Sequence, residues 1–211
     1  MDTRAGTEPF VTRLERAVRH FRLQAAHNLL DEAFAAHPPE TLVKDVGKPL
    51  LQRLEDPAAH RFATSLLELR LLAHAQGWER VNGPLAVLAC APTEEDTLAL
   101  IALGIALAER HCRIAYLGAA TPVEAVEETA RSQQAAVTVL SAERAQLARD
   151  EAHRLKRLEC PLIAIGAARE GLAKQAGATA LDVDAPTTAP RIAGMARRWE
   201  SSRRSDEPSP T

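Results

Sequence analysis

Aromatic residues are scarce in this sequence, and their scarcity argues against one class of function. Phe, Trp and Tyr make up 3% of the 211 residues, too few to build the stacking platforms on which proteins bind single-stranded nucleic acid. The formal net charge is −2, and no basic stripe stands out except in the last few residues, so duplex DNA also lacks an electrostatic footprint. We therefore expect no direct binding of nucleic acid.

Cysteine is scarce as well. Cys90, Cys112 and Cys160 are odd in number and contain no CxxC pair, which argues against a disulfide framework or a zinc site. No apolar run approaches the ~18 residues of a membrane span, and the first residues lack the apolar segment of a secretory signal. We expect reduced thiols, a cytoplasmic location and no membrane association.

The motifs of common enzyme classes are missing. The chain has no P-loop, no GxGxxG fingerprint and no Ser-His-Asp order with a nucleophile elbow. Most histidines have no acidic or nucleophilic partner at a readable spacing: His20, His27, His37, His74 and His153. We therefore expect a protein that is not an enzyme.

Residues 8–80 carry apolar side chains at helical spacing. The first stripe consists of Phe10, Leu14, Val18 and Phe21. Pro38-Pro39 ends the first region, and further helices are expected at 41–54, broken near Pro49 or Asp56-Pro57, and at 60–78. Four antiparallel helices with short connections predict a small four-helix bundle.

The period changes in residues 84–200. Apolar runs predict strands at 85–90, 113–117, 136–141, 161–165 and, more weakly, 178–183. Helical segments are expected between and after them, at about 95–110, 122–133, 143–157, 168–176 and 187–199. Alternating strands and helices predict an α/β domain with a five-stranded parallel sheet of the flavodoxin or Rossmann-like kind. The Ser-, Arg- and Pro-rich segment 201–211 is predicted to be a disordered tail.

An acidic segment, Glu94-Glu95-Asp96, stands between the first predicted strand and an Ala- and Leu-rich helix. In parallel α/β domains this junction is where ligands bind. Thr93 is predicted to be the N-cap of the helix, and Asp96 the carboxylate that returns a hydrogen bond to it. Three acids in the first turn would also complement the helix dipole. We therefore expect a self-satisfied helix start and no metal site, because crowded acids alone seldom specify one.

Three further segments carry a resemblance to a known family: Ala115-Tyr116-Leu117-Gly118-Ala119-Ala120-Thr121-Pro122, Val139-Leu140-Ser141 and Ile163-Ala164-Ile165-Gly166. With a helical bundle ahead of the α/β domain, they resemble the cobalamin-binding module of light-responsive transcriptional regulators and corrinoid proteins. The resemblance runs from about residue 10 to residue 199. It implies a helical cap followed by a Rossmann-like domain of the cobalamin-binding type.

The resemblance also shows what this chain has lost. The family's first loop carries an acidic residue, then one residue, the histidine that binds cobalt, two residues and a glycine. Glu94 keeps the acidic place here, while Asp96 replaces the histidine and Ala99 replaces the glycine. A carboxylate is a harder donor than imidazole, and the Ala99 methyl stands where the family's nucleotide tail passes close to the backbone.

Other family positions have changed too. The tryptophan and the glutamate-histidine pair that cover the upper face of the corrin correspond to Leu50, His60 and Arg61. The family's serine-x-threonine becomes Ser141-Ala142-Glu143, and its glycine pair becomes Gly166-Ala167. The resemblance thus implies nine cofactor-contact candidates: Leu50, His60, Arg61, Glu94, Asp96, Ala99, Ser141, Gly166 and Ala167.

Two residues leave alternatives open. His60 is either a polar surface residue or an axial ligand for haem or cobalt. Cys90, at the carboxyl end of the first strand, is either a small buried hydrophobe or a thiolate ligand. We expect no firmly held cofactor, with cobalamin and haem both left open as ligands.

The leading hypothesis is a non-enzymatic sensor or regulatory protein, acting in transcriptional regulation through a protein partner, with histidine-on cobalamin binding lost or weakened. Because the bundle begins near residue 8, we expect no preceding DNA-binding domain. A corrinoid carrier subunit of a methyltransferase and a haem-binding sensor stay open as alternatives. So does a ligand-free structural protein whose bundle forms a homo-oligomer.

Overall fold

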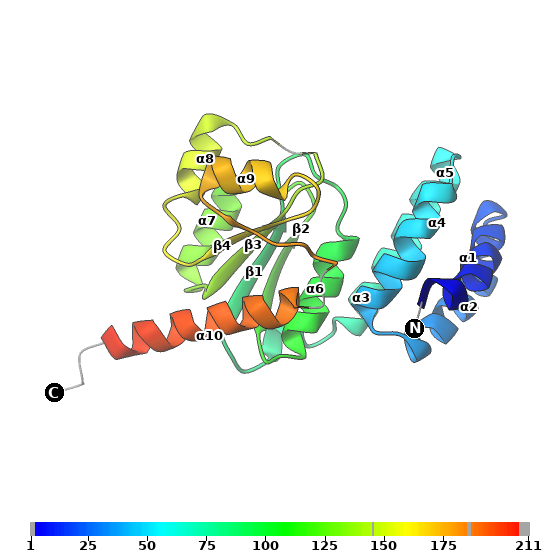
Figure 1. The fold of residues 1–211 in the computed structure, drawn as a ribbon, viewed down its shortest axis with the longest axis horizontal. Coiled ribbons are helices and arrows are strands. Elements are labelled where there is room, and N and C mark those ends of the chain that lie inside the picture. The colour runs from blue at the N-terminus through cyan, green and yellow to red at the C-terminus, as the bar shows by residue number, and fades with distance from the viewer. Residues whose placement is uncertain (1–2, 145, 185–186, 207–211) are drawn as a thin grey trace. The chain divides into compact units, whose positions relative to one another are not determined.

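The computed structural model describes residues 3–144, 146–184 and 187–206. Its internal contacts divide the chain into two compact units, Met1–Gln76 and Gly77–Thr211. The first unit is helical, and in the second unit helices surround a parallel sheet (Figure 1). None of the described helices is both long and apolar enough to cross a membrane.

The described residues of the first unit form four helical segments, as the sequence predicted. Their bounds are α1 Thr3–Arg19, α2 Leu23–Ala36, the continuous series α3 Pro39–Leu42, η1 Val43–Gly47 and α4 Lys48–Arg53, and α5 Pro57–His74. Of the two breaks that the sequence offered, the one near Pro49 does not occur and the one at Asp56-Pro57 does, because α4 ends at Arg53 and α5 begins at Pro57. Near Pro49 the chain instead forms a π-helical turn, η1, directly before α4. Pro49 is the second residue of α4, directly after this π-helical turn.

The start of α5 differs from the prediction because Asp56 caps it. The Asp56 carboxylate accepts hydrogen bonds from the amides of Ala58 (3.3 Å) and Ala59 (3.2 Å), and Pro57 takes the first helical position. His60 is therefore the fourth residue of α5 rather than its first. The helix ends at His74, and Trp78 opens the short 3₁₀ helix η2, Trp78–Arg80, of the second unit.

The core of the first unit follows only part of the predicted stripe. Leu14 and Val18 are fully buried, but Phe21 is 51% exposed. Phe21 has a φ of +50° in the turn after α1, which takes its side chain off the helical stripe. Its ring contacts Phe62 edge-to-face, with 5.5 Å between the ring centroids.

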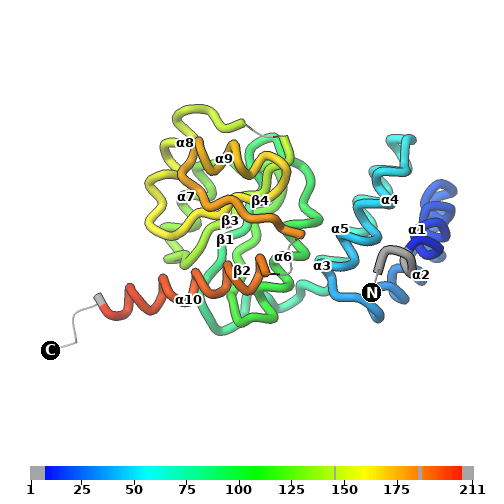
Figure 2. The backbone as a smooth tube through the Cα atoms, viewed as in Figure 1, coloured from blue at the N-terminus to red at the C-terminus, as the bar shows by residue number. Residues whose placement is uncertain are grey.

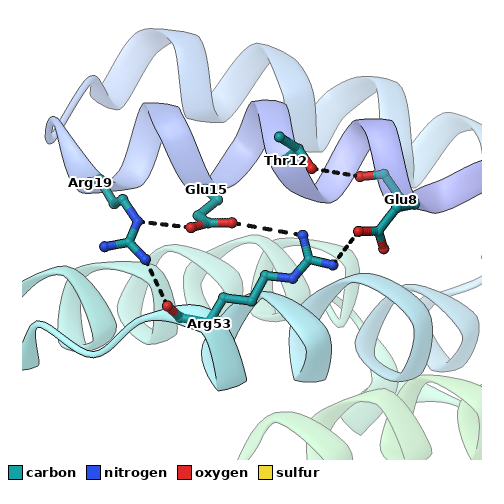
Figure 3. A network of polar contacts seen from close by, with 5 residues as sticks. All are labelled: Glu8, Thr12, Glu15, Arg19 and Arg53. Carbon is teal, nitrogen blue, oxygen red and sulfur yellow. Dashed lines mark hydrogen bonds and ion pairs between the residues drawn. The ribbon is translucent and has the colours of Figure 1, made fainter.

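An ionic network joins α1 to the end of α4 (Figure 3). The Arg53 guanidinium lies 2.6 Å from the Glu8 carboxylate and 3.8 Å from that of Glu15. Glu15 also accepts from Arg19 at 2.8 Å, and Arg19 donates to the Arg53 carbonyl at 2.8 Å. Exposed pairs of this kind contribute at most about 1 kcal/mol each. The buried apolar residues therefore stabilise the unit more than the network does.

The second unit is built on five parallel strands in the order β2-β1-β3-β4-β5. The strands are β1 Leu85–Cys90, β2 Arg113–Gly118, β3 Val137–Ser141, β4 Leu162–Ile165 and β5 Thr179–Ala180. This strand order is that of flavodoxin-like domains, so the predicted fold class is confirmed. The fifth strand is shorter than the predicted 178–183.

Helices cover both faces of this sheet, as the backbone trace also shows (Figure 2). They are α6 Leu98–Ala108, α7 Val123–Ser132, α8 Arg149–Leu155, α9 Arg169–Ala176 and α10 Thr188–Asp206. Helices α6 and α10 share one apolar cluster with the sheet, and α7, α8 and α9 share another on the opposite face. Strands β1, β3 and β4 are buried along their whole length, which explains their largely apolar runs.

The predicted disorder from residue 201 is wrong for residues 201–206, which continue α10. The hydroxyls of Ser201 and Ser205 donate to carbonyls four residues earlier, and Arg204 pairs with Glu200 at 3.2 Å. These contacts satisfy the last turns of the helix locally. Residues 207–211 lie outside the described part of the chain.

Gly104 in α6 is predicted to be intolerant of a side chain. A Cβ at this position would lie 2.5 Å from Trp78 Cζ3 and 2.9 Å from Leu88 Cδ1. We expect Gly104→Ala to lower the free energy of unfolding by about 1–3 kcal/mol, measured by chemical denaturation. Gly171→Ala in α9 is the matched control, because its Cβ would meet nothing within 4 Å. That control should gain about 0.4–1 kcal/mol, and equal effects of the two substitutions would contradict the packing described here.

Candidate functional site

The strand order places a topological switch point at the carboxyl ends of β1 and β3. From β1 the chain continues into α6 on one face of the sheet, and from β3 it continues into α8 on the other. The loops after β1 and β3 therefore leave two adjacent strands toward opposite faces of the sheet. In flavodoxin-like sheets this is the switch point where ligands bind.

The loop after β1 starts with a tight turn. The amide of Glu94 donates to the carbonyl of Ala91 at 3.0 Å, with Pro92 second in the turn and Thr93 third. Thr93 has a φ of +70°, the conformation that the third position of a type II turn requires and that a β-branched residue rarely adopts. Thr93 is thus a turn residue.

The predicted helix start is consequently wrong. Helix α6 begins at Leu98, its N-cap position is Thr97, and no acidic residue lies in its first turn. Asp96 still binds a helix amide, but two residues ahead rather than in a capping box with Thr93. Its Oδ1 accepts from the amide of Leu98 at 3.1 Å.

Glu94 binds two neighbouring loops. Its Oε2 accepts from the amides of Glu143 (2.8 Å) and Arg144 (3.2 Å), both in the loop after β3. Its backbone carbonyl accepts from the amide of Ala120, in the loop after β2, at 2.7 Å. One residue therefore connects three loops at this edge of the sheet.

Glu143 repeats this arrangement one strand further along. Its Oε2 accepts from the amide of Ala167, in the loop after β4, at 3.2 Å. Gly166 makes the approach feasible, since it has a φ of +90° and a Cβ there would lie 2.3 Å from the carbonyl oxygen of Ala142. A larger residue at position 166 would force the two loops apart.

These contacts form a series that we call the loop strap: Ala120, Glu94, Glu143 and Ala167. The loops that they connect follow β2, β1, β3 and β4, which is also the spatial order of those strands. Each loop is thus bound to its neighbour in the sheet. Both side-chain links are carboxylates that accept from backbone amides, and such charge-assisted bonds are stronger than neutral ones.

Six of the nine candidate residues lie in the second unit. Glu94, Gly166 and Ala167 meet in and beside the loop strap. Ser141 ends β3, is 2% exposed, and accepts from the amide of Ala91 through its carbonyl at 2.8 Å. Asp96 is exposed, and Ala99 is half-buried in the first turn of α6. The edge of the sheet therefore brings four of the six together around its loops.

The other three candidates belong to the first unit. Leu50 in α4 is 1% exposed, whereas His60 and Arg61 in α5 are both exposed. The His60 carbonyl accepts from the Thr64 hydroxyl at 3.0 Å, an ordinary bond one turn along the helix. The location of His60 at the surface leaves its imidazole accessible.

Glu143 and Ala120 are site residues that the sequence reasoning did not select. Glu143 could have been found from its position two residues after the third predicted strand, beside the switch point. Ala120 carries no such signal. Its φ is +44°, and a positive φ is not expected at an alanine.

The three cysteines are buried and form no disulfide. The Cys90 thiol donates to the carbonyl of Asp96 at 3.4 Å, which anchors the end of the first loop to β1. Burial raises the pKa of the Cys112 and Cys160 thiols. Among the described residues, no group of three or more His, Cys, Asp or Glu is arranged to hold a metal ion.

The raised thiol pKa values predict a loss of stability in alkali. A folded-state pKa above the unfolded value stabilises the fold at neutral pH, and this contribution is lost as the pH rises through the thiol range. We expect the free energy of unfolding to fall above a pH of about 8.5, measured by denaturant titration at several pH values. The double variant Cys112→Ala/Cys160→Ala should show a shallower fall. Identical pH profiles would show that the buried thiols are not responsible.

Comparison with known proteins identifies the fold. No protein-family model and no curated protein matches the chain by sequence. Among solved structures, it is similar to a monomethylamine corrinoid protein from Methanosarcina barkeri, with 17% identity, a TM-score of 0.64, and coverage of 89% of this chain and 98% of that one. This likeness shows that the chain has the fold of a corrinoid protein, a helical region followed by a Rossmann-like domain.

Two other solved structures are similar over most of the chain. One is a methanol:cobalamin methyltransferase complex from Methanosarcina barkeri, with 14% identity, a TM-score of 0.46 and coverage of 95% of this chain and 86% of that one. The other is a cobalamin-binding protein from Desulfitobacterium hafniense DCB-2, with 12% identity, a TM-score of 0.40 and coverage of 92% and 97%.

The residues of the first loop do not fit a corrinoid held by an imidazole from that loop. Segment 91–97 contains no histidine, and the carboxylate of Asp96 accepts from the amide of its own helix. Glu94, which would orient an imidazole, is bound to the loop after β3. This edge therefore belongs to a fold similar to that of a corrinoid protein, and its first loop offers no imidazole.

Proposed function

We propose that this chain is a non-enzymatic sensor or regulatory module, built on the corrinoid-protein fold, that acts in transcriptional regulation through a protein partner. One observation carries the proposal. Asp96 stands where the resemblance puts the cobalt-binding histidine, and its carboxylate accepts from the amide of Leu98. The proposal includes the loss or weakening of histidine-on cobalamin binding.

The chemistry of the loop supports this loss. Carboxylate oxygens are hard donors that suit Mg²⁺ or Ca²⁺ better than the softer cobalt of a corrinoid. A ligating imidazole also needs a hydrogen-bond acceptor to fix its orientation. Glu94 is the acidic residue at the right spacing, but its carboxylate already accepts from Glu143 and Arg144. Asp96 and Glu94, at the positions of the family's histidine and acidic residue, thus both accept hydrogen bonds from amides of this chain.

A protein partner fits the surface of the chain better than DNA does. The formal net charge of −2 gives no general attraction to phosphate. The first unit carries exposed large apolar side chains, Phe21, Leu23 and Leu69, of which Leu69 is 60% exposed. These side chains are available to a protein partner or a second copy, which would bury them.

The second candidate is a corrinoid carrier subunit of a methyltransferase. The observation in its favour is the fold, which the monomethylamine corrinoid protein shares. A carrier must ligate cobalt reversibly, and the first loop offers no imidazole for that task. A haem sensor that uses the exposed His60 imidazole is tested in the same experiment, since haem commonly takes an axial histidine.

The test is ligand retention. Purified protein is mixed with aquacobalamin, methylcobalamin or haemin and desalted, and its visible spectrum is recorded. We expect the unaltered chain to retain no cobalamin, and Asp96→His/Ala99→Gly to gain retention, because the pair supplies an imidazole and removes a methyl. Glu95→His/Ala99→Gly is the control, since it adds an imidazole at the neighbouring exposed position. Cobalamin retained by the unaltered chain would refute the proposal, and haem retention abolished by His60→Ala would favour the haem sensor.

A further inference from the structure

The loop strap places two carboxylates on three backbone amides, two in the loop after β3 and one in the loop after β4. We propose that it is an autoinhibitory latch: Glu94 and Glu143 occupy these amides, and a ligand that binds the carboxyl edge of the sheet must compete with them. The inference rests on the proposed function and deepens it, because it says what controls ligand access to the carboxyl edge of the sheet.

The latch consists of strong contacts. Amide hydrogen bonds to ionised groups contribute more than neutral ones, and the bond from the Glu143 amide to Glu94, at 2.8 Å, is in the charge-assisted range. The amides of Glu143, Arg144 and Ala167 would otherwise be available to a ligand. An oxyanion, such as the phosphate of a nucleotide-like group, is the chemistry that such clustered amides accept. The chain's own carboxylates occupy those donors.

The latch also acts in series. The amide of Glu143 is held by Glu94, and the carboxylate of Glu143 holds Ala167. Release of Glu94 therefore frees the residue whose side chain makes the second link. Release of Glu143 alone leaves the first link in place. A strap with this order predicts an asymmetric response to removal of the two carboxylates.

Backbone strain on both sides of Glu94 indicates a poised element. Thr93, directly before it, has a φ of +70°, and Ala120, whose amide it binds, has a φ of +44°. Non-glycine residues in this region persist only where surrounding contacts impose them. The hydrogen bonds of Glu94 are such contacts. Their release would let Thr93 and Ala120 relax. Opening would therefore cost less free energy than opening a loop without this strain.

Amide hydrogen exchange, measured by NMR on the full chain, tests the series. We expect Glu94→Ala to accelerate exchange at the amides of Glu143, Arg144 and Ala167 by about tenfold or more. Glu143→Ala should accelerate exchange at Ala167 alone. Glu95→Ala is the matched control, because Glu95 is the exposed neighbour of Glu94. An unchanged exchange rate at Ala167 in Glu94→Ala would overturn the series.

Glu94→Gln guards against a variant that merely unfolds. It keeps an acceptor oxygen and removes the charge, so the three amides should exchange at rates between those of the unaltered chain and Glu94→Ala. Core amides of β1 and β3 should keep their protection in all variants. Acceleration throughout the sheet would indicate general destabilisation and count against a latch.

Ligand entry is measured in the Asp96→His/Ala99→Gly background with aquacobalamin as the probe. Adding Glu143→Ala should strengthen binding by about tenfold, the gain expected from removing one charged competitor, whereas adding Glu95→Ala should leave binding unchanged. Equal affinities would overturn the autoinhibitory role. The two proposals fail separately: cobalamin retention by the unaltered chain refutes the proposed function, while the exchange pattern tests the latch without any ligand.

Discussion

The carboxylate of Glu94 is the contact on which the carboxyl edge of this protein depends. It lies after β1, the strand that neighbours both β2 and β3, so its loop can reach the loops on either side. Its side chain binds the loop after β3, and its carbonyl binds the loop after β2. Backbone bonds from Thr121 to Cys90 (3.3 Å) and from Ala168 to Ala142 (3.0 Å) also join neighbouring loops, and the bonds of Glu94 add to them.

The rest of the second unit holds Glu94 in position. Cys90 and Leu98 mark the fixed ends of its loop, one at the end of a fully buried strand and the other at the start of a helix that is buried along almost all its length. Helix α6 cannot shift easily, because Gly104 packs against Trp78 and Leu88 with no room for a methyl group. A rigid core thus sets the distance that the loop spans, and the tight turn at Thr93 aims Glu94 toward β3.

The sequence predicts the features that depend on neighbouring residues better than those that depend on contacts between distant residues. The strands are readable because both faces of the sheet are covered, so each buried strand is an unbroken apolar run. The start of α6 is not readable, although Thr93 and Asp96 have the spacing of a capping box. Glu94 is bound to a residue 49 positions away, and a local rule cannot anticipate a loop whose shape is set by such a partner.

The same limit applies to the candidate site. The absence of an imidazole at position 96 is visible in the sequence and needs no coordinates. The occupation of the loop amides is not visible, because it depends on Glu143 and Ala167 meeting across two strands. The end of α10 differs, because its contacts are local. Serine hydrogen bonds and an ion pair join residues four positions apart, although the composition alone suggests a disordered polar tail.

The two departures from corrinoid binding reinforce each other physically. A side chain tethered beside its amides competes at a high effective concentration, which short connections raise to the millimolar range or above. Any external anion must overcome this advantage before it binds. With aspartate at position 96, a corrinoid would lack the binding free energy of an imidazole–cobalt bond. The loop strap adds the free energy needed to displace Glu94 and Glu143 from the amides. The loop amides of this edge are thus already bound within the chain, which is consistent with the proposed recognition by a protein partner.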